Sequence, residues 1–285
     1  MVEDLKDKMN NLNATKRTYG FLWLRPKRKS LPPRWHFADM QEIIPEPIVT
    51  GKLGIDIGSG CGYDTYFMAK NNPLVNIFSL DISDGVYTTK EVTSGLKNVR
   101  IIRGSALNIP IHDNVFNFAY SYGVLHHTTD PQGGLKEIVR VLKKGAPVFL
   151  YLYEDHSDNW LKYFIISIIK MLRQVTVRIP PKILYIITFL ASPFVVLLFS
   201  YPARFLKSFR KTQGLAEKIP FNFGTSLSSV TGDLFDRFST PIEHRFNRDE
   251  VYNLLHNAGF VDVDVKKFRT KAGWVAWGRK ADVNR

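Results

Sequence analysis

A glycine-rich run and one aspartate have the types and spacing that could bind a cofactor. The run 58–62 (GSGCG) follows a short apolar segment at 53–57. Glycine has no Cβ, so this backbone can turn tightly and approach a ligand closely, and a following helix would offer free N–H groups. Asp81 ends the next apolar segment, 19 residues after the last glycine. A carboxylate at that place can accept hydrogen bonds from both hydroxyls of a ribose. The pair predicts a site for a nucleoside cofactor.

Strand-like and helix-like runs that alternate along the chain must position these residues. Five apolar runs predict strands, at 53–57, 75–80, 99–102, 115–120 and 147–153, and helices are expected at 63–70 and 135–142. This alternation indicates βαβ units and a mainly parallel sheet, whose ligands bind beyond the carboxyl ends of the strands. Two further strands, at 260–268 and within 271–279, have a connection so short that it allows only an antiparallel pair.

The expected fold class is α/β: a Rossmann-like, mainly parallel seven-stranded sheet with an antiparallel last strand. An apolar helical segment is inserted between the fifth and sixth strands. Four zones follow: an N-terminal extension of a short helix and loops (1–50), a cofactor-binding core (51–155), an apolar basic insertion or lid (156–235), and a C-terminal helix and strands that complete the sheet (236–285).

Composition excludes several classes of protein. The 285 residues are 45% hydrophobic and 23% charged, as in ordinary globular proteins and unlike disordered chains. The single cysteine, Cys61, excludes a disulfide framework and a cysteine-built zinc site. The polar first residues give no sign of a secretory signal.

Taken together, the motifs resemble the class I S-adenosylmethionine-dependent methyltransferases, most of all the branch that includes the ubiquinone and menaquinone biosynthesis methyltransferases. The segments that carry the resemblance are 54–62 (GIDIGSGCG), Asp81, 116–127 (FNFAYSYGVLHH) with the following Asp130-Pro131, and 135–145 (LKEIVRVLKKG). The resemblance implies S-adenosyl-L-methionine as the cofactor and methyl transfer as the reaction.

The resemblance also implies which residues contact the cofactor. Asp56 and the first two glycines of the loop would hold the methionine part, Asp81 the ribose, and Ile82 would pack beside the adenine. Ser105 stands where the family usually has an acid that bonds the adenine amino group, and a hydroxyl accepts more weakly than a carboxylate. The full expected set is Asp56, Gly58, Ser59, Gly60, Gly62, Asp81, Ile82, Ser105, Ala106 and Leu125.

His126 and His127 are the catalytic candidates. Methyl transfer from a sulfonium is an in-line displacement, so positioning supplies much of the acceleration, and a base is needed only if the acceptor must lose a proton. On an extended segment adjacent side chains point opposite ways, so one histidine at most should face the site. Tyr122 and His244 are the next candidates, and structural hydrogen bonding is the alternative role for each. The histidines lack metal-ligand spacing with any third group, so no metal is expected.

The net charge of +13 gathers in the most apolar part of the chain. Residues 160–218 contain ten basic residues and one acid, Glu217. Within them, 183–203 is uncharged and long enough to span a bilayer as a helix, which Pro193 should kink and Pro202 could end. Residues 160–173 predict an amphipathic helix, which could be interfacial or a core helix. This composition favours contact with a membrane surface through residues 160–210.

Topology limits how this zone could meet a bilayer. A single crossing would put the last two strands on the other side from the first five, so the zone must enter and leave from one face. A hairpin in one leaflet, a helical lid lying on the bilayer and a buried lid over the site all satisfy this condition.

The sequence therefore predicts a methyltransferase acting on a small, hydrophobic or lipid-linked acceptor, in the cytoplasm and peripheral or monotopic at the cytoplasmic membrane. The same chemistry on a soluble sugar or secondary metabolite, with the apolar segment as a lid or dimer interface, is one alternative. A non-catalytic membrane-associated scaffold that retains the fold is another. Nucleic acid is disfavoured as a substrate because no Asn-Pro-Pro-Tyr-type run follows the fourth strand and no cysteine lies outside the cofactor loop. The acceptor atom and the oligomeric state stay open.

Overall fold

The structure, a computed structural model, describes residues 2–24, 36–221, 226–268 and 272–282. The chain divides into two compact units, which are described separately. The first contains residues 1–154 and 242–285, and the second contains residues 155–241.

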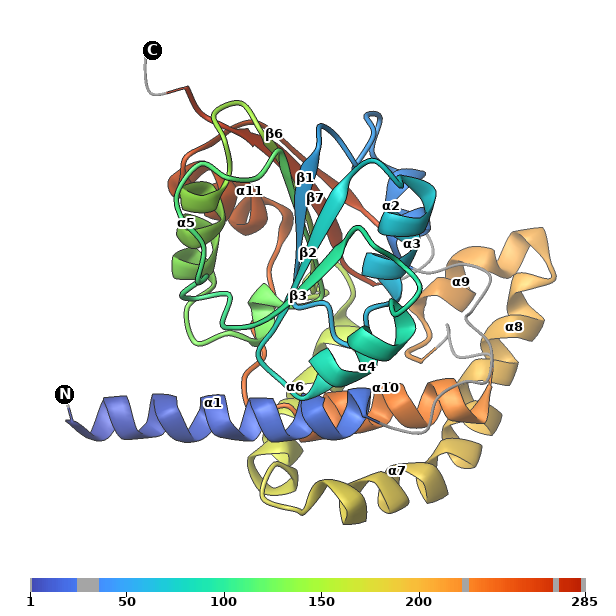
Figure 1. The fold of residues 1–285 in the computed structure, drawn as a ribbon. Coiled ribbons are helices and arrows are strands. Elements are labelled where there is room, and N and C mark those ends of the chain that lie inside the picture. The colour runs from blue at the N-terminus through green and yellow to red at the C-terminus, as the bar shows by residue number, and fades with distance from the viewer. Residues whose placement is uncertain (1, 25–35, 222–225, 269–271, 283–285) are drawn as a thin grey trace. The chain divides into compact units, whose positions relative to one another are not determined.

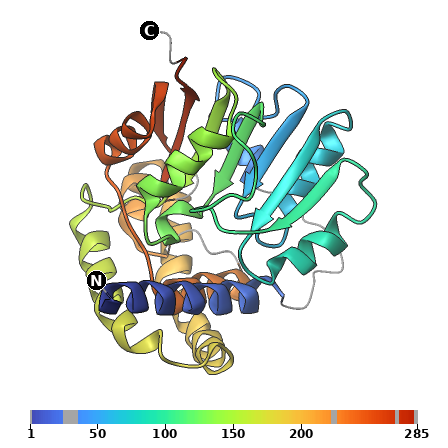
Figure 2. The same cartoon turned by 60° about the vertical axis from the view of Figure 1, so that its left-hand side comes forward.

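The first unit is built on one seven-stranded sheet (Figure 2). Its order is β3-β2-β1-β4-β5-β7-β6, and all neighbours are parallel except β7, which runs antiparallel to both β5 and β6. The predicted sheet is thereby confirmed. The strands are β1 (Leu53–Ile57), β2 (Asn76–Asp81), β3 (Val99–Arg103), β4 (Phe118–Tyr122), β5 (Pro147–Leu152), β6 (Phe260–Lys267) and β7 (Trp274–Lys280).

Helices cover both faces of this sheet (Figure 1). Helices α5 (Pro131–Val141) and α11 (Arg248–Ala258) pack on one face, and α2 (His36–Gln41) and α3 (Tyr63–Asn71) pack on the other. Residues of β5 alternate between the two cores and are all buried, which explains its continuous apolar run. The unit also contains α1 (Val2–Trp23), α4 (Gly85–Val92) and a 3-10 turn, η1 (Leu125–His127).

Three local predictions were wrong in this unit. The fourth strand begins at Phe118 rather than Val115, because the N–H groups of residues 115 and 116 donate to the carbonyl of Val141. The two histidines lie in η1 and not on an extended segment. The N-terminal zone contains the 22-residue helix α1, not only a short helix.

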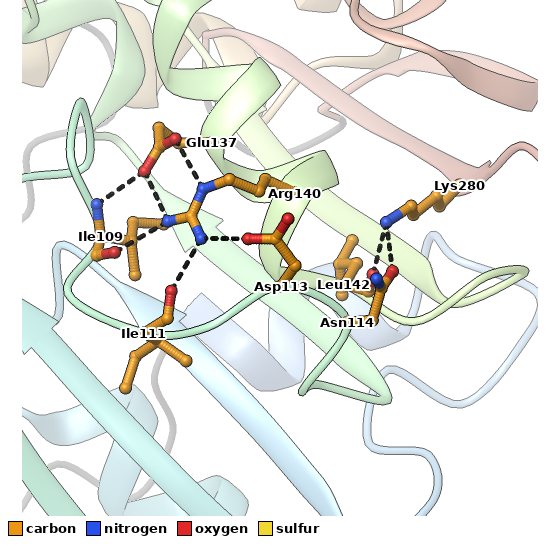
Figure 3. Close-up of polar contacts among 8 residues, drawn as sticks. All are labelled: Ile109, Ile111, Asp113, Asn114, Glu137, Arg140, Leu142 and Lys280. Atoms are coloured by element: carbon orange, nitrogen blue, oxygen red, sulfur yellow. Dashed lines mark hydrogen bonds and ion pairs between the residues drawn. The ribbon is translucent and has the colours of Figure 1, made fainter.

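The segment between β3 and β4 is held by Arg140 of α5 (Figure 3). The Arg140 guanidinium donates to the carbonyl oxygens of Ile109 and Ile111, at 2.8 and 2.7 Å, and to the carboxylates of Asp113 and Glu137, each at 2.8 Å. Glu137 in turn accepts from the N–H of Ile109 at 2.8 Å. These bonds raise the pKa of Arg140 and lower the pKa of Glu137, so both groups are charged. The clamp fixes the loop that follows Ser105.

We expect Arg140→Leu to lower the free energy of unfolding by about 2 kcal/mol, since two carbonyls and two carboxylates lose a charged donor at a partly exposed site. Urea denaturation measures the change. Arg100→Leu is the matched control, because its exposed guanidinium donates only to the nearby carbonyls of Lys97 and Val99. Equal unfolding midpoints for the two variants would show that the Arg140 contacts do not stabilise the fold.

The second unit is entirely helical in the part that the structure describes. Residues 181–207 form one continuous helical rod, which is long and apolar enough to cross a membrane. The elements are α6 (Trp160–Thr176), α7 (Pro181–Val195), the π-helical turn η2 (Val196–Ser200), α8 (Tyr201–Lys207), the 3-10 turn η3 (Arg210–Thr212), α9 (Gln213–Lys218) and α10 (Leu227–Ser239).

Two prolines behave differently in this rod. Pro193 lies inside α7, and the π-helical turn follows directly, as expected where a residue without N–H interrupts the ladder. The sequence suggested that Pro202 could end the helix, but it does not. It occupies the first turn of α8, where a missing N–H costs little, and the helix continues to Lys207.

Candidate functional site

A pocket with about 790 Å³ of empty space, open to solvent, lies at the carboxyl ends of β1, β2 and β4 in the first unit. Six parts of the chain line it: one face of α1, the loop after β1, the end of β2, the segment after β3, the end of β4 with the segment after it, and Ile242. In both cartoon views α1 runs along this end of the sheet (Figures 1 and 2). The pocket therefore lies where the strand pattern places the ligand of such a sheet.

The loop after β1 requires glycine for steric reasons. Gly58 has φ 75° and Gly60 has φ 56°, both in the left-handed region. A Cβ on Gly58 would lie 2.2 Å from the Val124 side chain, and a Cβ on Gly60 would lie 2.9 Å from Trp23. The N–H groups of Gly58 and Ser59 already donate to the carbonyl of Leu80. Glycine is thus required here by the close packing of Val124 and Trp23, and the N–H groups of Gly58 and Ser59 are already used within the protein.

Asp81 is held rigidly at the pocket wall. One carboxylate oxygen accepts from the N–H of Gly60 at 2.8 Å, and the other accepts from the N–H and hydroxyl of Ser83 at 2.7 and 2.6 Å. A carboxylate has about four acceptor sites, so these three donors leave capacity for a further one. The geometry suits a ribose hydroxyl.

The structure brings half of the predicted site residues to the pocket wall. These are Gly58, Asp81, Ile82, Ser105, Ala106 and His127. The other half lie outside the pocket lining, namely Asp56, Ser59, Gly60, Gly62, Leu125 and His126. Roles for both groups stay predictions.

Asp56, one of the predicted residues outside the pocket lining, has a structural contact. Its carboxyl group is buried and accepts from the Thr65 hydroxyl. Burial first, and then the neighbouring Asp64 carboxylate, raise the pKa of Asp56 well above its usual range. The contact with Thr65 joins β1 to the first turn of α3 and so supports the glycine loop between them.

The two adjacent histidines have different surroundings. Nδ1 of His127 lies 2.9 Å from the carbonyl oxygen of Ile242. A carbonyl only accepts, so Nδ1 carries the proton and Nε2 of the neutral ring carries the lone pair. His126 is fully buried, stacks on Tyr153, and has no hydrogen-bond partner on either ring nitrogen among the described residues. Of the two histidines, only His127 is in the pocket lining.

His126 predicts a measurable pH dependence of stability. Burial first, and then the charges of His127 and Arg245, lower the pKa of His126 well below 6.5. In the window below pH 6.5 the unfolded chain therefore binds a proton that the folded chain does not. Stability that is present above this window is lost as the pH falls, by up to about 1.4 kcal/mol per pH unit. Denaturation of His126→Leu between pH 7 and 5 should show a shallower loss than the parent, whereas the exposed-site variant His112→Asn should match the parent. A parallel loss in His126→Leu and the parent would contradict this assignment.

The next candidate bases, Tyr122 and His244, are less suited than His127. Burial and the neighbouring Tyr151 raise the pKa of Tyr122 well above 10, so it stays protonated. Nε2 of His244 lies 3.0 Å from the carbonyl oxygen of Thr128, and the residue is absent from the pocket lining.

Sequence reasoning missed two contributions to this region. Leu12, Thr15, Tyr19 and Trp23 of α1 line the pocket, and their spacing of three or four residues was a helical signal that the polar composition of α1 hid. His36 was also missed: its Nδ1 lies 3.4 Å from the buried Asp64 carboxylate, and its ring stacks on Tyr122 at 3.9 Å.

Comparison with known proteins gives consistent matches. Residues 55–150 match a family model described as "Methyltransferase domain". The 2-methyl-6-phytyl-1,4-hydroquinone methyltransferase 2 of Oryza sativa subsp. japonica is 32% identical over 149 residues, covering 51% of this chain and 42% of the relative. A demethylmenaquinone methyltransferase of Corynebacterium kroppenstedtii is 30% identical, covering 43% and 55%. This chain thus spans about half the length of these curated relatives.

A solved structure shares the fold. The crystal structure of a SAM-dependent methyltransferase from Methanosarcina mazei superposes with a TM-score of 0.50 at 17% identity, covering 82% of this chain and 95% of that one. The similarity extends beyond the matched domain to most of the chain.

Proposed function

We propose that this chain is a class I S-adenosylmethionine-dependent methyltransferase and that it transfers a methyl group to a small hydrophobic acceptor with an aromatic ring. The observation that carries this proposal is one pocket whose wall contains both the Asp81 carboxylate and the His127 imidazole. The first suits the ribose of the cofactor, and the second can accept a proton from the acceptor.

The residues at the cofactor end fit S-adenosyl-L-methionine, which supplies an electrophilic methyl group when bound. Asp81 would hold the ribose, and the apolar side chains of Ile82 and Ala106 would flank the adenine. The Ser105 hydroxyl accepts from the N–H of Leu107 at 3.1 Å and keeps a second lone pair for the adenine amino group. Gly58 lies in the pocket lining, and its left-handed backbone packs so closely against Val124 that a Cβ would not fit there.

The remaining wall fits a planar, apolar acceptor. The Tyr19 ring of α1 lies 5.5 Å from the His127 ring, and Leu12 and Ile242 add aliphatic surface. A hydroquinone placed against these rings would present a hydroxyl to a histidine. Both curated relatives are named for methylating compounds of the quinone class, which supports this choice of acceptor.

His127 would act as the general base. Its Nδ1–H donates to the Ile242 carbonyl, which fixes the ring and leaves the lone pair on Nε2. When an acceptor hydroxyl loses its proton to Nε2, electron density rises on the acceptor and attack on the methyl group is favoured. Positioning in the pocket supplies the rest of the acceleration.

We also propose that the acceptor is lipid-linked and that the enzyme meets it at a membrane surface, through residues 160–210. Labelling a cell extract with methyl-labelled cofactor and the purified protein, followed by separation of lipid from aqueous products, tests this part. Label in the lipid fraction supports it. Label confined to aqueous products would favour a soluble acceptor, and cofactor binding without any labelled product would favour a scaffold.

A further inference from the structure

Helix α7 of the second unit has its polar side chains inside and its apolar side chains outside. Its buried residues include Thr188 and Ser192, and the Ser192 hydroxyl lies 2.7 Å from that of Thr231 on α10. Its exposed residues are large and apolar, from Ile186 (58%) through Leu190 (62%) to Phe194 (66%). A helix that faces water shows the opposite arrangement.

Helix α6 shows this inversion in part, since Ile169 is buried as well and Lys170 is exposed. The Arg173 side chain is buried and donates through Nε to the carbonyl of Arg237 at 2.8 Å, while the Thr176 hydroxyl donates to the carbonyl of Phe238 at 2.7 Å. Outward, Trp160, Met171 and Val175 are 79%, 61% and 65% exposed. The rod continues the pattern, with exposed Leu197, Leu198, Tyr201 and Phe205. Exposed apolar surface on three successive helices indicates a partner that is itself apolar.

The charges around this surface identify the partner. Exposed cations lie before and at the start of the rod, at Arg178 and Lys182, and at and beyond its end, at Arg204, Lys207 and Arg210. Glu217 is the only acid between Trp160 and Lys218. Apolar side chains bordered by cations match a leaflet with hydrocarbon below anionic headgroups. A second copy of this chain would bring the same positive charge and be repelled.

The rod is long enough to cross a bilayer, yet its surroundings favour an in-plane position. Helix α10, which packs along α7, carries Asp233, Asp236 and Arg237, and a crossing would take these groups into hydrocarbon. The ends of the second unit also lie close together, since its neighbours in the first unit are Glu154 and Ile242 and Glu154 pairs with Phe246. The chain therefore enters and leaves this unit from one side.

We infer that α6, α7 and α8 lie in the plane of an anionic membrane leaflet, with their apolar faces in the hydrocarbon and α10 above it. The docking stands on the second unit alone. Its use, to meet a lipid-linked acceptor, rests on the proposed function.

Sedimentation with vesicles tests the docking. The intact protein should pellet with phosphatidylcholine vesicles that contain phosphatidylglycerol, less with phosphatidylcholine alone, and only partly less at high salt, because apolar insertion is not screened. The double variant Leu190→Gln, Leu198→Gln should bind about a hundredfold more weakly, at about tenfold per leucine removed from hydrocarbon.

The matched control is Leu74→Gln in the first unit, where the leucine is 89% exposed. It should bind like the parent. A parent protein that stays in the supernatant, as a monomer or as a dimer, would overturn the inference, and so would a double variant that pellets like the parent.

Labelling from outside sealed vesicles tests the in-plane position. Cys61 is buried and its pKa is raised to about 12, so it should not react with a maleimide at neutral pH. Single variants Lys182→Cys and Lys207→Cys place a thiol at each end of the rod. Labelling of both by a membrane-impermeant maleimide supports the in-plane position. Protection of either one until detergent is added would show a crossing and overturn it. Neither assay uses methyl transfer, so each can fail while the proposed enzyme activity stands.

Discussion

Replacing His127 with glutamine should lower kcat for a hydroquinone acceptor by about a hundredfold or more, which is the usual contribution of a general base. Glutamine can still donate to the Ile242 carbonyl, but it cannot take a proton from the acceptor. Affinity for S-adenosylhomocysteine should stay within a few fold of the parent, because the change is on the acceptor side of the pocket.

The control for this prediction is His256→Gln on the exposed face of α11, which should leave kcat unchanged. Steady-state kinetics over a pH series give the decisive reading. The parent should lose activity in acid, where a protonated imidazole cannot accept a proton, and His127→Gln should lose that dependence. An unchanged kcat in His127→Gln would show that methyl transfer needs no base at this position.

Replacing Asp81 with asparagine should weaken S-adenosylhomocysteine binding by about 2 kcal/mol, or about thirtyfold. Asparagine keeps the size of the side chain but removes the charge that strengthens hydrogen bonds to the ribose. It also loses one of the acceptor oxygens that hold the N–H of Gly60 and the Ser83 hydroxyl.

Isothermal titration calorimetry measures this change. Asp84→Asn is the matched control, because Asp84 is half-exposed and pairs with Arg103. Thermal unfolding of both variants separates lost affinity from lost stability. If Asp81→Asn binds as tightly as Asp84→Asn, Asp81 is not a ribose ligand.

The sheet could be predicted from the sequence because its signals are local. Apolar runs mark the strands, and those of β1 to β4 each end in, or directly before, a glycine or an aspartate. The short turn before β7 allows only an antiparallel pair. The start of β4 could not be predicted from local sequence, because Phe116 forms an isolated bridge with Leu142, 26 residues later, outside the strand.

The pocket lining could be predicted only where a recognisable sequence motif forms it. The glycine loop and Asp81 are visible as a motif, whereas the wall from α1 depends on the packing of a mostly polar helix against residues far along the chain. The 3-10 turn decides which of His126 and His127 reaches the pocket. The sequence does not reveal this, because both residues are histidines. The zone boundaries near residues 50, 155 and 235 stay predictions.

The second unit shows another limit of composition. Hydropathy identifies residues 183–203 as unusually apolar, but it does not show which side of the helix is covered. Only the contact between Ser192 and Thr231 shows that the polar side faces inward. That contact shows that the apolar side of this helix faces outward.

Analysis of the reaction product tests most directly whether this protein methylates an acceptor of the quinone class. The purified protein is incubated with methyl-deuterated S-adenosyl-L-methionine and reduced demethylmenaquinone or 2-methyl-6-phytyl-1,4-hydroquinone, and the extracted quinone is analysed by mass spectrometry. We expect the mass gain of one deuterated methyl group on an acceptor of this class, reduced in Asp81→Asn when the cofactor is limiting and strongly reduced in His127→Gln. Tight cofactor binding with no labelled quinone from either acceptor would contradict it.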